Sequence, residues 1–236
     1  MTVVPDRMRE FRDFVASRFI GGTGIEIGPG NSPVRLPPGL AVARYVDMAP
    51  IEDLMTIHQM PDGWVAPDIV DDAEKLSSFE EGSLDFLIAN HVIEHTQDPV
   101  RVMRTWLNRL RPDDVVFMAV PDKRFSFDVD RPLTPAAHVI GDYLEGSQHS
   151  EDDHLFEWAT VVNKMEGDAE IARCISEMKR LDLRPHYHVW NIESFLDLIL
   201  ECRGVYFDFE LEFCGRNDTE TLLVLRKPLD GTLSQA

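Results

Sequence analysis

The stretch GIEIGPGNSP, residues 24–33, decides the fold class of this sequence. A short apolar run leads into it, and Gly28 and Gly30 then punctuate a turn-forming segment. A strand that breaks into glycines brings its backbone close enough for a ligand to lie against it. A pair of glycines alone is equally typical of a tight turn without a ligand, so the interpretation depends on the residues further along the chain.

A carboxylate follows at the distance that a nucleoside-binding fold requires. Asp47 stands seventeen positions after Gly30, directly behind the apolar run 43–46. An acidic residue at the end of a second strand accepts hydrogen bonds from ribose hydroxyls, although a loop carboxylate or helix cap is the structural alternative. Pro33 replaces the third glycine of the dinucleotide motif, which favours a nucleoside cofactor without a pyrophosphate over NAD or FAD.

Strand and helix patterns alternate on both sides of this motif. Apolar runs typical of buried parallel strands occupy residues 24–27, 43–46, 84–89 and 115–120. Apolar residues at helical spacing predict helices over 6–19, 98–110, 135–144 and 168–181. The runs 205–213 and 221–226, joined by the turn-forming residues 215–218, predict an antiparallel hairpin. We therefore predict an α/β fold with a mostly parallel sheet and an antiparallel C-terminal hairpin.

Composition narrows the class of protein. The 236 residues, 44% of them hydrophobic, suit a single domain spanning 1–236. A net charge of −19, from 42 acidic and 23 basic residues, disfavours a nucleic-acid partner. The sequence lacks the roughly 20 consecutive apolar residues of a membrane span, so we expect no membrane partner. Three unevenly spaced cysteines indicate free thiols, and we expect a cytoplasmic protein.

The glycine motif resembles that of class I S-adenosylmethionine-dependent methyltransferases, and the resemblance continues in order through residues 69–124. It implies a Rossmann-like sheet of about seven strands with the last one antiparallel. It also implies that S-adenosyl-L-methionine is the cofactor, with Asp47 at the ribose, Asp72 and Ala73 at the adenine, and Asn90 and His91 beside the methionyl portion. The implied cofactor-binding residues are Glu26, Gly28, Gly30, Asp47, Asp72, Ala73, Asn90 and His91.

A second resemblance concerns residues 121–190. The segments PDKRF (121–125), RPLTP (131–135) and HYHVW (186–190) resemble sugar O-methyltransferases of polysaccharide biosynthesis, such as the mycobacterial methylmannose polysaccharide type. Residues 123–189 interrupt the strand–helix rhythm with helical segments and are too long for a structureless loop, so we expect a partly helical, acceptor-binding insertion before the last helix. From the resemblance we expect a small polar acceptor, a sugar or oligosaccharide, and we consider a homodimer.

Methyl transfer to a hydroxyl requires that the acceptor lose a proton, and histidine suits that task. His154 and His188 lie in the insertion and are our candidate catalytic bases. Tyr187 and Trp190 beside His188 are candidates for a sugar-stacking wall. Asp122, at the end of the fourth apolar run, is our candidate ligand for Mg²⁺.

Three alternatives remain open. The first is a methyltransferase acting on another small molecule, because the same cofactor half would serve any acceptor. The second is a cofactor-binding module without turnover. The third, a nicotinamide-dependent sugar oxidoreductase, is weakened by Pro33 and by the lack of a Tyr-x-x-x-Lys pair in the sequence.

Overall fold

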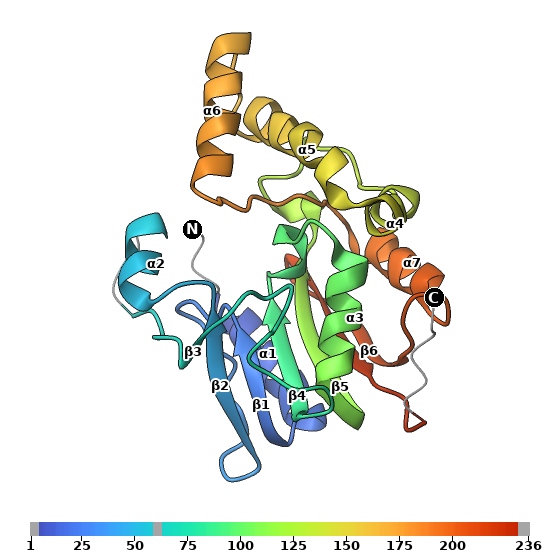
Figure 1. Cartoon of the computed structure of the whole chain (residues 1–236). Helices are drawn as coiled ribbons and strands as arrows, with labels where there is room; N and C mark the ends of the chain where they lie inside the picture. Colours follow the sequence, from blue (N-terminus) through green and yellow to red (C-terminus); the bar gives the residue numbers. More distant parts are fainter. Residues whose placement is uncertain (1–4, 59–62, 231–236) are drawn as a thin grey trace.

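A computed structural model describes residues 5–58 and 63–230 (Figure 1). The elements are α1 (Asp6–Phe19), β1 (Gly22–Ile27), β2 (Ala41–Asp47), α2 (Ile51–His58), β3 (Ile69–Val70), β4 (Leu84–Asn90), η1 (Ile93–His95), α3 (Pro99–Arg109), β5 (Leu110–Pro121), η2 (Lys123–Phe125), α4 (Ala136–Glu145), η3 (Ser147–His149), α5 (Glu151–Glu157), η4 (Trp158–Val162), α6 (Asp168–Arg180), α7 (Ile192–Cys202), β6 (Glu210–Asn217) and β7 (Glu220–Arg226). The four predicted helices each match a helix of the structure to within one residue at either end.

The sheet has seven strands in the order β3-β2-β1-β4-β5-β7-β6. Neighbouring strands from β3 to β5 pair in parallel, whereas β7 runs antiparallel to both β5 and β6. The predicted Rossmann-like, mostly parallel sheet with an antiparallel C-terminal hairpin is therefore confirmed. The chain order of the strands reverses at β1, which lies between β2 and β4, and in such sheets ligands bind outside the carboxyl ends of the strands at this point.

Both faces of the sheet are buried because side chains alternate along each strand. In β4, Leu87 and Ala89 join the core on the α3 and α7 side, where the Trp106 ring is fully buried. Phe86 and Ile88 join a separate core on the α1 side. Burying each large apolar side chain stabilises the fold by about 1.5–3 kcal/mol, so the two cores fix where the strand ends lie.

The hairpin turns later in the chain than the sequence predicts. Gly215 and Asn217 pair with Leu222 and Glu220 within the ladder, so they belong to β6 and are not turn residues. The tight turn holds Asp218, whose φ is +57°. Asn217 is fixed in the strand because its side-chain amide donates hydrogen bonds to the Met8 carbonyl (3.1 Å) and to Glu220 (2.6 Å).

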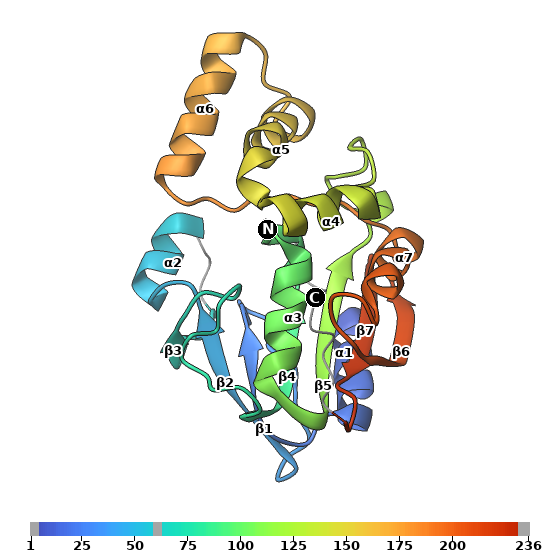
Figure 2. The same ribbon diagram turned by 45° about the vertical axis from the view of Figure 1, so that its right-hand side comes forward.

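The insertion between β5 and α7 covers the carboxyl edge of the sheet. Helices α4, α5 and α6 lie beyond the ends of the parallel strands in both views (Figures 1 and 2). The insertion therefore faces the strand ends at which the sequence places the cofactor residues. Within the described ranges, no helix is both long and apolar enough to span a bilayer.

Candidate active site

The glycine turn leaves β1 with two residues in the left-handed region. Gly28 has φ +59° and Gly30 has φ +56°. A Cβ at Gly28 would lie 3.7 Å from Val92, and one at Gly30 would lie 3.6 Å from the Trp64 ring, which are ordinary contacts. Backbone conformation, not lack of space, therefore favours glycine at both positions.

Glu26 is buried beneath this turn. Its carboxyl oxygens accept a hydrogen bond from the Val34 amide at 3.1 and 3.2 Å, which ties the end of the loop back to β1. Burial raises the pKa of Glu26 to about 8. The geometry thus gives Glu26 a role in shaping the glycine loop.

The predicted ribose and adenine residues meet at the ends of β2 and β3. Asp47 is the last residue of β2, and its backbone carbonyl accepts a hydrogen bond from the Asp71 amide at 3.0 Å. The Ala73 carbonyl is fixed by the Trp106 indole at 2.8 Å. Asp72 lies 3.2 Å from Arg184, which comes from the segment after α6. Burial raises the pKa of Asp72, but hydrogen bonds from Arg184, the Glu74 amide and Lys75 outweigh burial, so the pKa is lowered overall.

Asn90 ends β4 and His91 follows it, and the two side chains differ in whether they have hydrogen-bond partners. Both polar atoms of the Asn90 amide are buried without a hydrogen-bond partner among the described residues. His91, with φ +56°, lies 2.8 Å from Glu220 and 3.4 Å from Glu94 through its two ring nitrogens. Burial opposes the charged ring, but hydrogen bonds to both carboxylates prevail and raise the pKa of His91 to about 9.

This cationic histidine belongs to a buried charge network. Arg12 donates to Glu220 from the opposite side, so Glu220 joins α1 to the end of β4. Burial raises the pKa of Glu220, yet Arg12 and His91 hold it at about 2. His91 is therefore a fixed positive charge at the edge of the site rather than a free base.

Asp122, the predicted magnesium ligand, is fully buried at the end of β5. Its Oδ1 accepts from the Arg124 backbone amide at 3.0 Å, and the Arg124 guanidinium donates to both carboxylate oxygens. Burial raises the pKa of Asp122, but the hydrogen bonds from Arg124 lower it overall. These contacts use the carboxylate in an ion pair, so the magnesium prediction finds no support in them.

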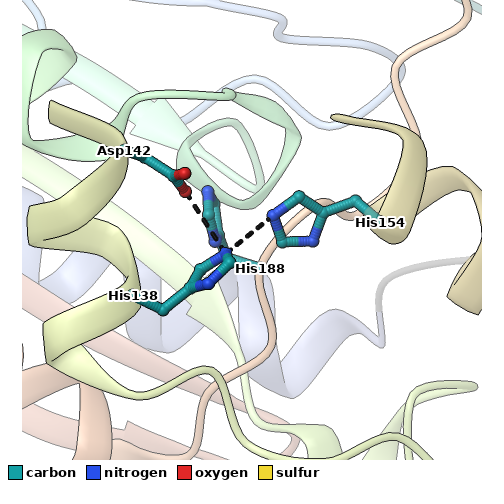
Figure 3. A group of neighbouring side chains, drawn as sticks. All are labelled: His138, Asp142, His154 and His188. Atoms are coloured by element: carbon teal, nitrogen blue, oxygen red, sulfur yellow. Dashed lines mark hydrogen bonds and ion pairs between the residues drawn. The ribbon is translucent and has the colours of Figure 1, made fainter. Parts of the chain in front are cut away.

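His154 and His188, the predicted bases, do lie together. Their ring centroids are 5.0 Å apart, and His138 and Asp142 of α4 complete the group (Figure 3). Burial and the neighbouring His138 lower the pKa of His154 to about 4, and burial holds the pKa of His188 well below its usual range. Both rings are neutral at pH 7.

A second group contains Glu94 and His95 from η1 together with His186. The His186 Nδ1 lies 2.7 Å from Asp128 Oδ2, and the His95 Nδ1 lies 2.7 Å from the Arg184 carbonyl. These bonds orient both rings, whose centroids are 4.6 Å apart. His186 and His188, two residues apart, thus enter two different groups.

The sequence matches the family model described as a methyltransferase domain over residues 4–195. The chain belongs to this methyltransferase family. Among solved structures, PH0226 from Pyrococcus horikoshii OT3 shares 16% identity at a TM-score of 0.51, with 94% of this chain and 89% of the other covered. A chain from the complex of the Haloferax volcanii Trm112 methyltransferase activator with a putative methyltransferase shares 11% identity at a TM-score of 0.52. The match again covers 94% of this chain and 89% of the other.

The CurJ carbon methyltransferase shares 17% identity at a TM-score of 0.46. The match covers 88% of this methyltransferase but 49% of that chain, so this chain spans about half the length of CurJ. No curated protein matches the sequence. At these identities, a likeness between structures shows the fold alone.

The family implies S-adenosylmethionine as the cofactor, and the carboxyl edge of this methyltransferase fits it. The glycine turn exposes backbone beside the end of β1, and the unpartnered Asn90 amide offers a donor and an acceptor where β4 ends. Sequence reasoning missed three residues of the edge: Glu94, Arg184 and Glu220. Glu94 had a local signal, since it stands three positions after His91. Arg184 and Glu220 had none for this edge, because their partners there, Asp72 and His91, are more than a hundred residues away.

Proposed function

We propose that the protein transfers the methyl group of S-adenosylmethionine to a hydroxyl of a small polar acceptor, a sugar or glycoside. The observation that supports this most is the group of imidazoles that the insertion holds over the carboxyl edge, in His138, His154 and His188. Acceptor hydroxyls must lose a proton during transfer, and groups that handle protons or hold metal ions assist that step.

In this proposal the cofactor lies across the strand ends. Asp47 accepts hydrogen bonds from the ribose, Asp72 and Ala73 border the adenine, and the Asn90 amide faces the methionyl portion. Gly28 and Gly30 bring backbone against it, while Glu26 and His91 hold the shape and charge of its surroundings. When bound, S-adenosylmethionine supplies an electrophilic methyl group, so the chain itself has to orient the acceptor and manage its proton.

His154 and His188 remain our candidates for managing that proton. His154 is partly exposed, whereas His188 is buried and only 1% exposed, so His154 is the more accessible of the two. They would act either directly as bases or through a metal ion that they hold. The low pKa of His154 keeps its lone pair free at neutral pH but makes the ring a weak base.

The residues predicted to form a sugar-stacking wall are too buried for that role, so we assign the wall to other aromatic side chains. Tyr187 and Trp190 are buried, and the Trp190 ring packs against His188 and Phe195. Phe127 is 54% exposed and lies edge-on to the Trp158 ring at 5.3 Å. We propose the Phe127 and Trp158 pair as the aromatic surface against which a sugar ring stacks.

Incubation of the purified chain with radiolabelled S-adenosylmethionine and a panel of acceptors tests the function. We expect methyl transfer to sugars or glycosides, and loss of transfer when the accepting hydroxyl is replaced by hydrogen. Transfer only to amines, carboxylic acids or quinones would support a methyltransferase with another small-molecule acceptor. Tight cofactor binding without transfer to any acceptor would support a binding module.

A further inference from the structure

Four side chains that suit a metal ion converge from three separate parts of the insertion. His138 and Asp142 share one face of α4, His154 comes from α5, and His188 comes from the segment before α7 (Figure 3). Each offers one ligand atom, and all four atoms lie within 4.8 Å of one another. His138 Nε2 lies 3.0 Å from His154 Nε2 and 3.3 Å from Asp142 Oδ2.

Two atoms in this group are buried without a hydrogen bond. His188 is 1% exposed, and its Nδ1 has no hydrogen-bond partner among the described residues. Asp142 is fully buried, and its Oδ2 forms no hydrogen bond there either. Buried polar atoms are normally satisfied, so a nitrogen and a carboxylate oxygen left over at one place indicate a missing electrophilic partner.

Hydrogen bonds around the group orient the ligands. His188 Nε2 lies 3.4 Å from the Gln97 carbonyl, and a proton on that nitrogen leaves a lone pair on Nδ1. Asp142 Oδ1 accepts from the Ser150 hydroxyl at 2.7 Å, which leaves Oδ2 for the group. Such outer contacts fix the tautomer and direction of metal-binding histidines.

We propose that His138, Asp142, His154 and His188 bind one divalent transition-metal ion. Three imidazole nitrogens and one carboxylate oxygen suit zinc or iron better than magnesium or calcium, which prefer oxygen ligands. Zinc bonds of about 2.0–2.2 Å place tetrahedral donor atoms roughly 3.3 Å apart, which is close to the two short separations in this group. Small movements of the side chains complete the set.

The ion would join α4, α5 and the segment before α7 over the carboxyl edge. His154 and His188 then act as ligands, and their lone pairs are not available to take a proton. Binding of the ion goes beyond the proposed function, because it does not depend on which acceptor is methylated or on methyl transfer itself.

The test uses the whole purified chain, stripped with a chelator and titrated with Zn²⁺ and with Co²⁺. We expect about one ion per chain by elemental analysis, a visible absorption band of bound Co²⁺, and a higher Tm with Zn²⁺. His138→Gln and His154→Gln should weaken zinc binding by at least about 100-fold. The His138 side chain is 37% exposed, so His138→Gln is expected to fold, which circular dichroism checks.

His95→Gln is the matched control, because it makes the same change in the neighbouring group of Glu94, His95 and His186. It should keep the zinc affinity of the unchanged chain. The proposal is overturned if the unchanged chain takes up less than about 0.1 ion, or if folded His138→Gln and His154→Gln proteins bind zinc as tightly as the unchanged chain. None of these readouts uses methyl transfer, so failure of this proposal is distinguishable from failure of the proposed function.

Discussion

Arg184 Nη1 lies 3.2 Å from Asp72 Oδ1, although the two residues are 112 positions apart in the sequence. Arg184 follows α6, at the end of the insertion, and Asp72 belongs to the turn after β3. The same guanidinium nitrogen lies 3.4 Å from Glu74. This contact thus joins the insertion directly to the proposed adenine-binding turn.

This ion pair should contribute measurably to stability. We expect a double-mutant cycle with Asp72→Asn and Arg184→Gln to give a coupling of about 1 kcal/mol in the free energy of unfolding, because both side chains are three-quarters buried. Urea unfolding of the four proteins measures it. Additive effects would show that the contact contributes nothing.

Replacing Asp47 tests the cofactor site. Asp47→Ala should weaken binding of S-adenosylhomocysteine by about 1–3 kcal/mol, since the ribose hydroxyls lose charge-assisted hydrogen bonds. Calorimetric titration measures the change, and Asp53→Ala, at an exposed position on α2, is the matched control. Unchanged affinity in a folded Asp47→Ala protein would remove Asp47 from the site.

The pKa of Glu26 predicts how stability depends on pH. Burial raises that pKa to about 8 in the folded state, so the folded chain holds a proton that the unfolded chain releases above pH 4.5. The stability associated with this proton is present below pH 4.5 and is lost as pH rises through 8. The unchanged chain should therefore lose free energy of unfolding between pH 5 and pH 9, whereas Glu26→Gln carries no such carboxyl. Relative to the unchanged chain, the free energy of unfolding of Glu26→Gln should rise by at least about 1 kcal/mol over this range. Denaturant unfolding at both pH values measures this, and parallel pH profiles would contradict it.

His91 should titrate far above an ordinary histidine. Its pKa of about 9 reflects hydrogen bonds to Glu220 and Glu94 that outweigh burial. NMR titration of the ring should locate this transition, and Glu220→Gln should lower it by at least about one unit, because one of the two carboxylates is gone. A His91 pKa that is the same in both proteins would mean that Glu220 does not hold the charge.

Replacing His154 tests the proton step. His154→Ala should lower kcat by about 10²-fold while leaving cofactor affinity nearly unchanged. His58→Ala, at the end of α2, is the control and should do little. If His154 acts as a base, the rate should fall only as pH approaches 4, below the range of an exposed histidine, because burial and His138 lower its pKa. Loss of cofactor binding in His154→Ala would instead indicate a structural role.

Local pattern predicted the longer helices and most strands, but it gave no signal for α2, β3, α5 or α7 and did not fix every contact. The helix over 168–181 was predictable because its apolar spacing and acidic first turn are local signals, and the structure ends it one residue earlier. The hairpin turn was misplaced because Gly215 and Asn217 look like turn residues, yet cross-strand pairing with β7 holds them in β6.

For the candidate site, the sequence correctly placed Gly28 and Gly30 after one strand and Asp47 at the end of the next. Their part in cofactor binding stays a prediction. The partner of Asp122 was two residues away, but a carboxylate pattern alone does not distinguish a metal ligand from half of an ion pair. Only the folded chain shows that Asp142 completes the group of His138, His154 and His188. Asp142 shares α4 with His138, but His154 and His188 come from two other parts of the chain.

The antiparallel direction of β7 has a consequence for synthesis of the protein. Because β7 runs opposite to the parallel strands, its first residue, Glu220, arrives at their carboxyl edge and meets His91. A nascent chain on the ribosome therefore builds β1, β2, β4 and β5 well before it possesses Glu220, one of the two carboxylates that contact His91. The charge network at the carboxyl edge is completed only when the closing hairpin has been made, so a stalled chain lacking β7 would carry the glycine motif without Glu220.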